Sequence, residues 1–193
     1  MSEIRLHFEG PYPVCSDSAD VLDGCPHSKE SGIYLWAVQM PTGRYRITYI
    51  GETSASFYRR IKDHVIQTLG GNYRICDPTA MGNGIQRIVW DGLWRKGTRD
   101  KLPEFLRRYA ELVPLIKESL KTEVVFLAVL ECHRRLKRRI EGALAEAHRA
   151  CPEKASLLPE DIRYFRRRAD EVPVAVQVSA EKEIEGLPSE IWA

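Results

Sequence analysis

The sequence of 193 residues has no apolar run long enough to cross a bilayer. Even its longest, Val124–Leu130, falls far short of the roughly 20 residues that a transmembrane helix needs. The chain also begins without the basic and then apolar pattern of a signal peptide. Its five cysteines are odd in number and scattered, which does not suit a disulfide framework. We therefore expect a protein of the reduced cytoplasm that does not associate with membranes.

Several other features are absent or weak. The net charge is only +2, which is too small for a protein that binds any polyanion through charge alone. No basic-zipper, zinc-finger or homeodomain pattern is present, so the chain contains no visible dedicated reader of DNA sequence. No internal repeat is visible either. At this length, the chain can bury a respectable core in one domain.

Two apolar, β-prone runs predict a hairpin. They are Gly32–Gln39 and Tyr45–Glu52, separated by the turn-forming segment Met40–Gly43. A turn centred within that segment would place Tyr34 directly opposite Tyr49, on one face of the sheet. Facing tyrosines on strands are usually only a packing pair, and this interpretation stays open.

The hairpin is followed by a predicted helix, Ser54–Leu69, with a serine cap and the stop signal Gly70-Gly71. Its apolar residues are spaced by four, and Arg60 and His64 share the neighbouring face. An arginine suits a phosphate because its planar guanidinium donates two hydrogen bonds, and a histidine can exchange a proton near neutral pH. The alternative is a solvated basic helix face.

A second strand and helix come late in the chain. Glu123–Leu130 is apolar and β-branched, as in a buried strand, and Arg134–Ala150 has a helical stripe of apolar residues. Glu141 lies at the edge of that stripe. Considered alone, it is only a surface charge beside Lys137 and other basic residues.

Together these residues carry a resemblance. The order Gly32–Tyr34 (GIY), Tyr49–Gly51 (YIG) and then an aromatic residue followed three positions on by Arg60 resembles the GIY-YIG nuclease family. Glu141, in the context IEGAL, is similar to that family's late glutamate. The resemblance covers roughly residues 30–150. It implies an α/β (α+β) fold: a small three-stranded antiparallel sheet flanked by helices, with N- and C-terminal extensions.

The resemblance also implies an activity and a site. It implies a metal-dependent endonuclease that hydrolyses DNA phosphodiester bonds, with catalytic residues Tyr34, Tyr49, Arg60, His64 and Glu141. Glu141 would bind Mg²⁺ or Mn²⁺, which favour hard oxygen ligands. Arg60 would hold a phosphate oxygen, with Arg59 as a rival. We expect Tyr34 to accept the proton of the attacking water with help from His64, while Tyr49 orients the water or the phosphate.

Two departures from the family pattern leave a second function open. Many members carry a lysine directly after YIG, where this chain has Glu52, and no asparagine follows Glu141. The alternative is therefore a nucleic-acid-binding module of the same fold with impaired catalysis. Basic residues gather in two places and would serve either function by following a nucleic-acid backbone, unless they are merely solvated: Arg134, Arg135, Lys137, Arg138 and Arg139, then Arg163, Arg166, Arg167 and Arg168.

We expect three parts in the chain: an N-terminal extension at 1–29, a nuclease domain at 30–150 with an insertion at 70–101, and a C-terminal helical extension and tail at 151–193. A possible strand lies at Ile4–Phe8. Further helices are expected at Pro103–Leu120 and Glu160–Asp170, before a β-like segment and an acidic tail. In the insertion, Trp90 and Trp94 either pack against the core or stack on exposed bases.

Overall fold

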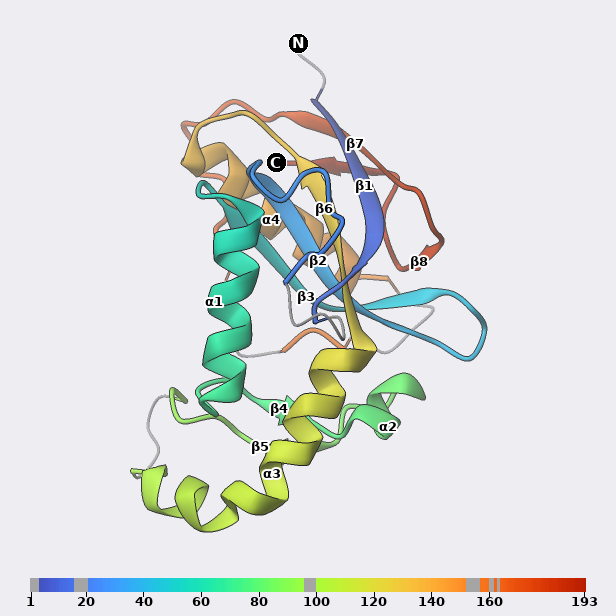
Figure 1. Cartoon of the computed structure of the whole chain (residues 1–193). Helices are drawn as coiled ribbons and strands as arrows, with labels where there is room; N and C mark the ends of the chain where they lie inside the picture. Colours follow the sequence, from blue (N-terminus) through green and yellow to red (C-terminus); the bar gives the residue numbers. More distant parts are fainter. Residues whose placement is uncertain (1–3, 16–20, 96–99, 152–156, 160–161, 163) are drawn as a thin grey trace.

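The computed structural model describes residues 4–15, 21–95, 100–151, 157–159, 162 and 164–193. Figure 1 shows how the elements are arranged. In chain order they are β1 (Ile4–Pro13), β2 (Gly32–Gln39), β3 (Tyr45–Thr53), α1 (Phe57–Leu69), β4 (Ile75–Cys76), α2 (Pro78–Gly82), β5 (Ile88–Trp90), α3 (Leu102–Thr122), β6 (Glu123–Val129), α4 (Arg134–Arg149), β7 (Ala175–Ala180), β8 (Ile184–Glu185) and β9 (Glu190–Trp192).

The main sheet is larger than predicted. It is a curled, mixed sheet of seven strands in the order β8-β3-β2-β6-β1-β7-β9 (Figure 1). The expectation of a small three-stranded antiparallel sheet flanked by helices is therefore wrong. β1 pairs with β6, and the end of the chain adds β7 and β9 beyond β1 and β8 beside β3. Such pairs join segments that are distant in the sequence, and local patterns do not reveal them.

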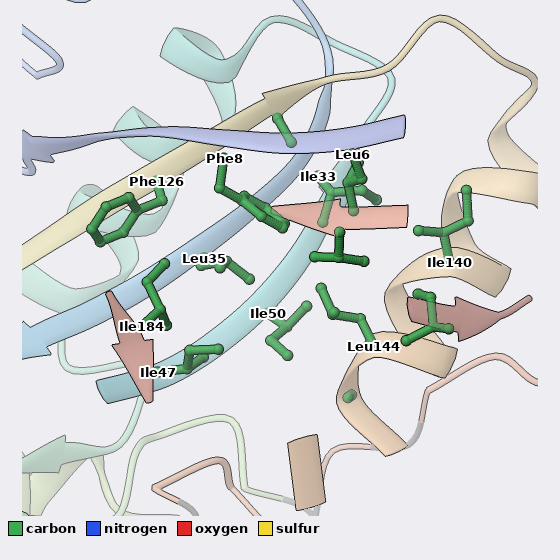
Figure 2. Packing of buried hydrophobic residues seen from close by; sticks show 14 of the residues in the cluster. Leu6, Phe8, Ile33, Leu35, Ile47, Ile50, Phe126, Ile140, Leu144 and Ile184 are labelled. Carbon is green, nitrogen blue, oxygen red and sulfur yellow. The ribbon is translucent and has the colours of Figure 1, made fainter. Parts of the chain in front are cut away.

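The two faces of the sheet bury different elements. Side chains alternate along a strand, so Ile33 and Leu35 of β2 point to the face covered by α4, where they join Ile140 and Leu144 (Figure 2). Trp36 points to the opposite face, which α1 and α3 cover. The hairpin is thus buried on both sides.

Local patterns predicted most of the central elements closely. β2 has the predicted bounds, while β3, β6 and α4 each differ by one residue at their ends. α3 also confirms the helix expected near residues 103–120. α1 begins at Phe57 rather than near Ser54, because the capping side chain is Ser56, whose hydroxyl accepts the N–H of Arg59 at 3.3 Å.

The predicted register of the hairpin is wrong. Tyr34 lies opposite Gly51, and Tyr49 lies opposite Trp36. Two features shift the pairing. The loop closes around a left-handed Gly43, which makes it longer than a two-residue turn, and an irregularity next to Trp36 leaves one residue of β3 without a partner. The total shift is two residues, so both tyrosines remain on one face.

The predicted helix Glu160–Asp170 is also wrong where the structure describes it, because residues 164–170 contain no helix. Glu160, Asp161 and Arg163 lie outside the described residues. The backbone of Phe165 instead passes so close to α4 that a Cβ on Gly142 would lie 2.0 Å from its carbonyl oxygen. The acidic tail, expected to be of uncertain order, forms β8 and β9.

Within the predicted insertion, residues 70–95 form a small layer of their own, with β4 paired to β5 and α2 packed beside α3 (Figure 1). Trp90 packs against Phe105 and donates its indole N–H to the carbonyl of Gly71 at 2.7 Å, which confirms the packing interpretation for this tryptophan. Among the helices of the described residues, none is both long and apolar enough to cross a membrane.

Candidate active site

Tyr34 occupies the centre of the site because its neighbour on β3 is a glycine. The Tyr34 side chain is fully buried, and its phenol lies over Gly51. A Cβ at Gly51 would lie 2.3 Å from the phenol oxygen of Tyr34, closer than any two such atoms can approach. The YIG glycine therefore makes the space that the GIY tyrosine occupies.

Tyr49 lies beside Tyr34 although the two residues are not direct partners. Their ring centroids are 6.1 Å apart with the planes tilted by 31°. This is the diagonal relation between residues of adjacent strands, within the reach of aromatic side chains. The structure thus brings the two predicted tyrosines together by a different register.

Helix α1 supplies the next two residues. Arg60 donates from Nε to the Tyr34 hydroxyl at 3.1 Å, and the same hydroxyl lies 3.1 Å from Nε2 of His64. Arg59 is exposed and points elsewhere. Since residues four apart share one face of a helix, α1 places Arg60 and His64 over the phenols, and of the two rival arginines only Arg60 reaches them.

Burial controls the protonation of these groups. It raises the pKa of Tyr34 well above its ordinary value, and the neighbouring Tyr49 adds to the rise while Arg60 opposes it. Burial also lowers the pKa of His64 to about 3, with a further contribution from Arg60. At neutral pH the phenol is therefore protonated and the imidazole is neutral. Tyr34 can accept a proton only if its own proton moves on, and Nε2 of His64 is within reach to take it.

Glu141 approaches from α4, on the other face of the sheet, and reaches around the edge of β3. Its Oε1 accepts the backbone N–H of Glu52 at 3.2 Å. β8 pairs only with Tyr45 and Arg46, so the later part of β3 is a free edge whose N–H groups need other acceptors. Burial and, to a smaller extent, the nearby Glu52 carboxylate raise the pKa of Glu141 to about 7.

Glu52 is a member of the site that the sequence did not predict. Its side chain is only 8% exposed, and Oε1 accepts from Nε of Arg134 at 3.3 Å and of Arg138 at 3.2 Å. Its Oε2 is buried without a hydrogen-bond partner. The sequence contained a signal for this contact. An acidic residue directly follows YIG, and two arginines lie four residues apart on one predicted helix.

Part of this site lines a cavity of about 470 Å³, whose lining does not include the buried Tyr34 and His64. Tyr49, Arg60 and Glu141 form its floor together with Glu52, while the guanidinium of Arg138 lies over the Phe165 ring, 4.4 Å from its centroid. Residues of the C-terminal segment complete the wall: Ile162, Tyr164 and Phe165. The cavity therefore combines three arginines with two carboxylates and two phenols, a set that can bind a phosphate diester.

The side chains present fit the metal that the resemblance implies. Among the residues that the structure describes, no three His, Cys, Asp or Glu side chains gather to hold a metal ion. Mg²⁺, however, usually takes only one or two protein carboxylates and completes its shell with water and substrate phosphate. Glu141 offers such a carboxylate, and Glu52 lines the same cavity.

The basic residues of α4 do not act as one surface. Lys137 is buried and donates from Nζ to the Ser31 hydroxyl at 2.8 Å and to the Thr53 carbonyl at 3.2 Å. Arg139 is buried against the carbonyls of Val172 and Ala193. These two residues hold the fold together, so the expected basic patch on this helix is narrower than the sequence suggested.

The chain was compared with known proteins. No family model matches it, and neither a curated protein nor a solved structure is significantly similar to it.

Proposed function

We propose that this protein is a metal-dependent endonuclease that hydrolyses DNA phosphodiester bonds by a GIY-YIG-type mechanism. The supporting observation is the convergence of five side chains predicted from motifs spread over more than half of the sequence. Tyr34, Arg60 and His64 form one hydrogen-bonded group, and Tyr49, Arg60 and Glu141 line one cavity. A purely structural cluster does not require three guanidinium groups facing an open cavity.

The chemistry follows from the positions of these groups. Arg60 would bind a non-bridging oxygen of the phosphate, and Tyr49 would orient the attacking water. The water oxygen attacks phosphorus while the bond to the leaving ester oxygen breaks. Tyr34 accepts the water proton as its own proton passes to Nε2 of His64, and the leaving oxygen is protonated from solvent in the cavity.

Glu141 would hold Mg²⁺ or Mn²⁺ with Glu52 beside it, and the metal, when bound, neutralises charge on the phosphate and the leaving oxygen. The ester oxygens of the substrate would complete the coordination shell. We therefore expect the metal to bind weakly to the free protein and more tightly with DNA present.

Incubation of the purified protein with plasmid, branched and single-stranded DNA tests the proposal. We expect cuts with Mg²⁺ or Mn²⁺ that disappear with EDTA and with Glu141→Gln. The Arg60→Ala variant should lose activity by about 10²–10³-fold, as other enzymes do when one transition-state donor is removed. Arg59→Ala is the matched control, because this neighbour on α1 is exposed, and it should cut at the parent rate.

The second candidate is a nucleic-acid-binding module with impaired catalysis. The ion pairs of Glu52 with Arg134 and Arg138 favour it, because they occupy two cations that a phosphate could otherwise use. Tight DNA binding without cuts by the parent protein, under every metal condition, would support this candidate. Equal cutting by the parent and Glu141→Gln would contradict the proposed mechanism.

A further inference from the structure

A second cavity, of about 410 Å³, adjoins the candidate active site on the face of the sheet that α1 and α3 cover. Tyr49 and His64 line it, and Tyr49 also lines the cavity of the candidate active site. Its volume falls within the roughly 300–1,000 Å³ of small-molecule sites. The phenol of Tyr49 therefore lies between a cavity lined by charged side chains and one lined largely by aromatic rings.

Aromatic rings form much of the wall. The Tyr73 ring lies 5.3 Å from His64 and packs edge-on against Trp94, with the ring centroids 5.6 Å apart. Trp36 lies on the other side of His64, at 5.6 Å. Trp94 also lines the cavity while 59% exposed, so it is not packed into the core as Trp90 is. Flat aromatic walls of this kind accept a flat ring.

Two residues of the cavity wall carry buried polar atoms that have no hydrogen-bond partner in the part of the chain that the structure describes. They are Nε1 of Trp36 and Oγ1 of Thr48, whose residues are only 5% and 7% exposed. Thr48 is the residue that the irregularity in the hairpin leaves unpaired, and bulges often redirect a side chain next to an active site. A buried donor without an acceptor is unfavourable, and a ligand that supplies the missing bonds would remove the cost.

A purely apolar ligand fits this cavity less well. Its two arginines, Arg74 and Arg95, share the single carboxylate of Asp91 with Lys101, so the cavity is polar at this end. An apolar ligand would leave the Trp36 and Thr48 atoms unsatisfied. A flat heterocycle with donors and acceptors on its edge satisfies both the aromatic walls and the polar atoms.

We propose that this cavity receives one nucleobase of the DNA substrate, turned out of its stack while the adjoining phosphate occupies the active site. The proposal rests on the proposed nuclease function. In DNA, a base and the phosphate attached to its sugar are neighbours. The two cavities are neighbours as well, because Tyr49 lines both of them. Because an unpaired base costs least to extrude, we expect a preference for DNA with a mismatch or an unpaired base next to the cut.

The test uses DNA duplexes in which 2-aminopurine, whose fluorescence rises on unstacking, is moved one position at a time past a mismatch. Binding is measured with Ca²⁺ in place of Mg²⁺, to separate binding from cleavage. We expect a fluorescence rise at one position with the parent protein. Thr48→Val and Trp36→Phe should each weaken binding by about tenfold, the effect of one hydrogen bond.

Stability separates this role from a structural one. Thr48→Val keeps the size of the side chain and removes a polar atom that has no partner among the described residues, so it should not lower the melting temperature. Trp192→Phe is the matched control, because this tryptophan is exposed on β9, and it should change neither binding nor fluorescence.

The outcomes are distinguishable. Cleavage with no fluorescence rise at any position, and with unchanged binding by both variants, would overturn the base cavity and leave the nuclease intact. A fluorescence rise that both variants weaken would support the base cavity, whether or not DNA is cut. The absence of any cut would contradict the proposed nuclease function and not the base cavity. Nucleoside monophosphates are titrated in parallel, and tighter binding of one of them than of DNA would overturn a DNA base as the occupant.

Discussion

At the scale of single residues, the site depends on close approach between backbone and ring. Tyr34 can lie over β3 only because Gly51 has no side chain, and its hydroxyl then meets Arg60 and His64. The two motifs are thus one physical unit, since each provides the space or the group that the other needs.

Gly51→Ala should therefore damage both fold and site. The added methyl group would overlap the Tyr34 ring, and such overpacking costs about 1–3 kcal/mol of unfolding free energy. We expect this loss in urea denaturation, together with reduced DNA cleavage. Gly82→Ala is the matched control, because a Cβ at Gly82 meets no atom within 4 Å. A Gly51→Ala variant as stable as the parent would contradict this packing.

His64 should make stability depend on pH. Burial holds its pKa at about 3 in the folded protein, against about 6.5 in the unfolded chain. A lowered folded-state pKa means that the contribution is complete above pH 6.5 and is lost as the pH falls towards 3. Between pH 7 and pH 4, the parent should lose about 3 kcal/mol more unfolding free energy than His64→Gln. Equal losses in urea titrations would disprove the buried neutral imidazole.

At the scale of elements, helix α4 divides its basic residues between fold and site. Lys137 is enclosed and holds the ends of two strands through Ser31 and Thr53. Arg134, three residues earlier, is 65% exposed at the mouth of the candidate active site. One turn of helix thus separates a structural cation from one that DNA can contact.

Substitution should separate these two roles. Lys137→Ala leaves the buried Thr53 carbonyl without its donor, so we expect a loss of about 1–3 kcal/mol in unfolding free energy. Arg134→Ala removes an exposed guanidinium while Arg138 still pairs with Glu52, so it should cost less than about 1 kcal/mol. It should nevertheless weaken DNA binding and reduce the slope of log affinity against log salt by about 1. The opposite pattern of effects would contradict this division.

At the scale of the whole molecule, the chain end belongs to the core. Ile191 is buried among residues of α4 and the main sheet, and the carbonyl of the terminal Ala193 accepts from Arg139. The same C-terminal part provides Tyr164 and Phe165 to the wall of the candidate active site. Fold and site therefore both depend on residues outside the region that carries the motifs.

Ile191→Ala should cost about 2–5 kcal/mol of unfolding free energy, the range for a large-to-small change in a core. Trp192→Ala, at the next position, removes an exposed ring and should change stability by no more than about 0.5 kcal/mol. Thermal denaturation of the two variants measures the difference. Similar stabilities would show that β9 is not part of the core.

Local structure was readable from the sequence alone: the two motif strands, the helices α1 and α4, and the shared helix face of Arg60 and His64. These features depend on neighbours a few residues apart, so a short window contains the whole cause. The register was not readable, because a longer loop and an unpaired Thr48 shifted it. Small local irregularities of this kind leave no clear pattern in a sequence.

Only the tertiary structure decided the extent of the sheet, the contact of Glu52 with α4, and the protonation of the buried groups. Each depends on segments that are far apart in the chain, such as β1 beside β7 or Glu141 beside Glu52. Burial is likewise a property of the assembled molecule, and together with Arg60 it lowers the pKa of His64 to about 3. The sequence determined which groups are available, and packing determined their surroundings and therefore what they can do.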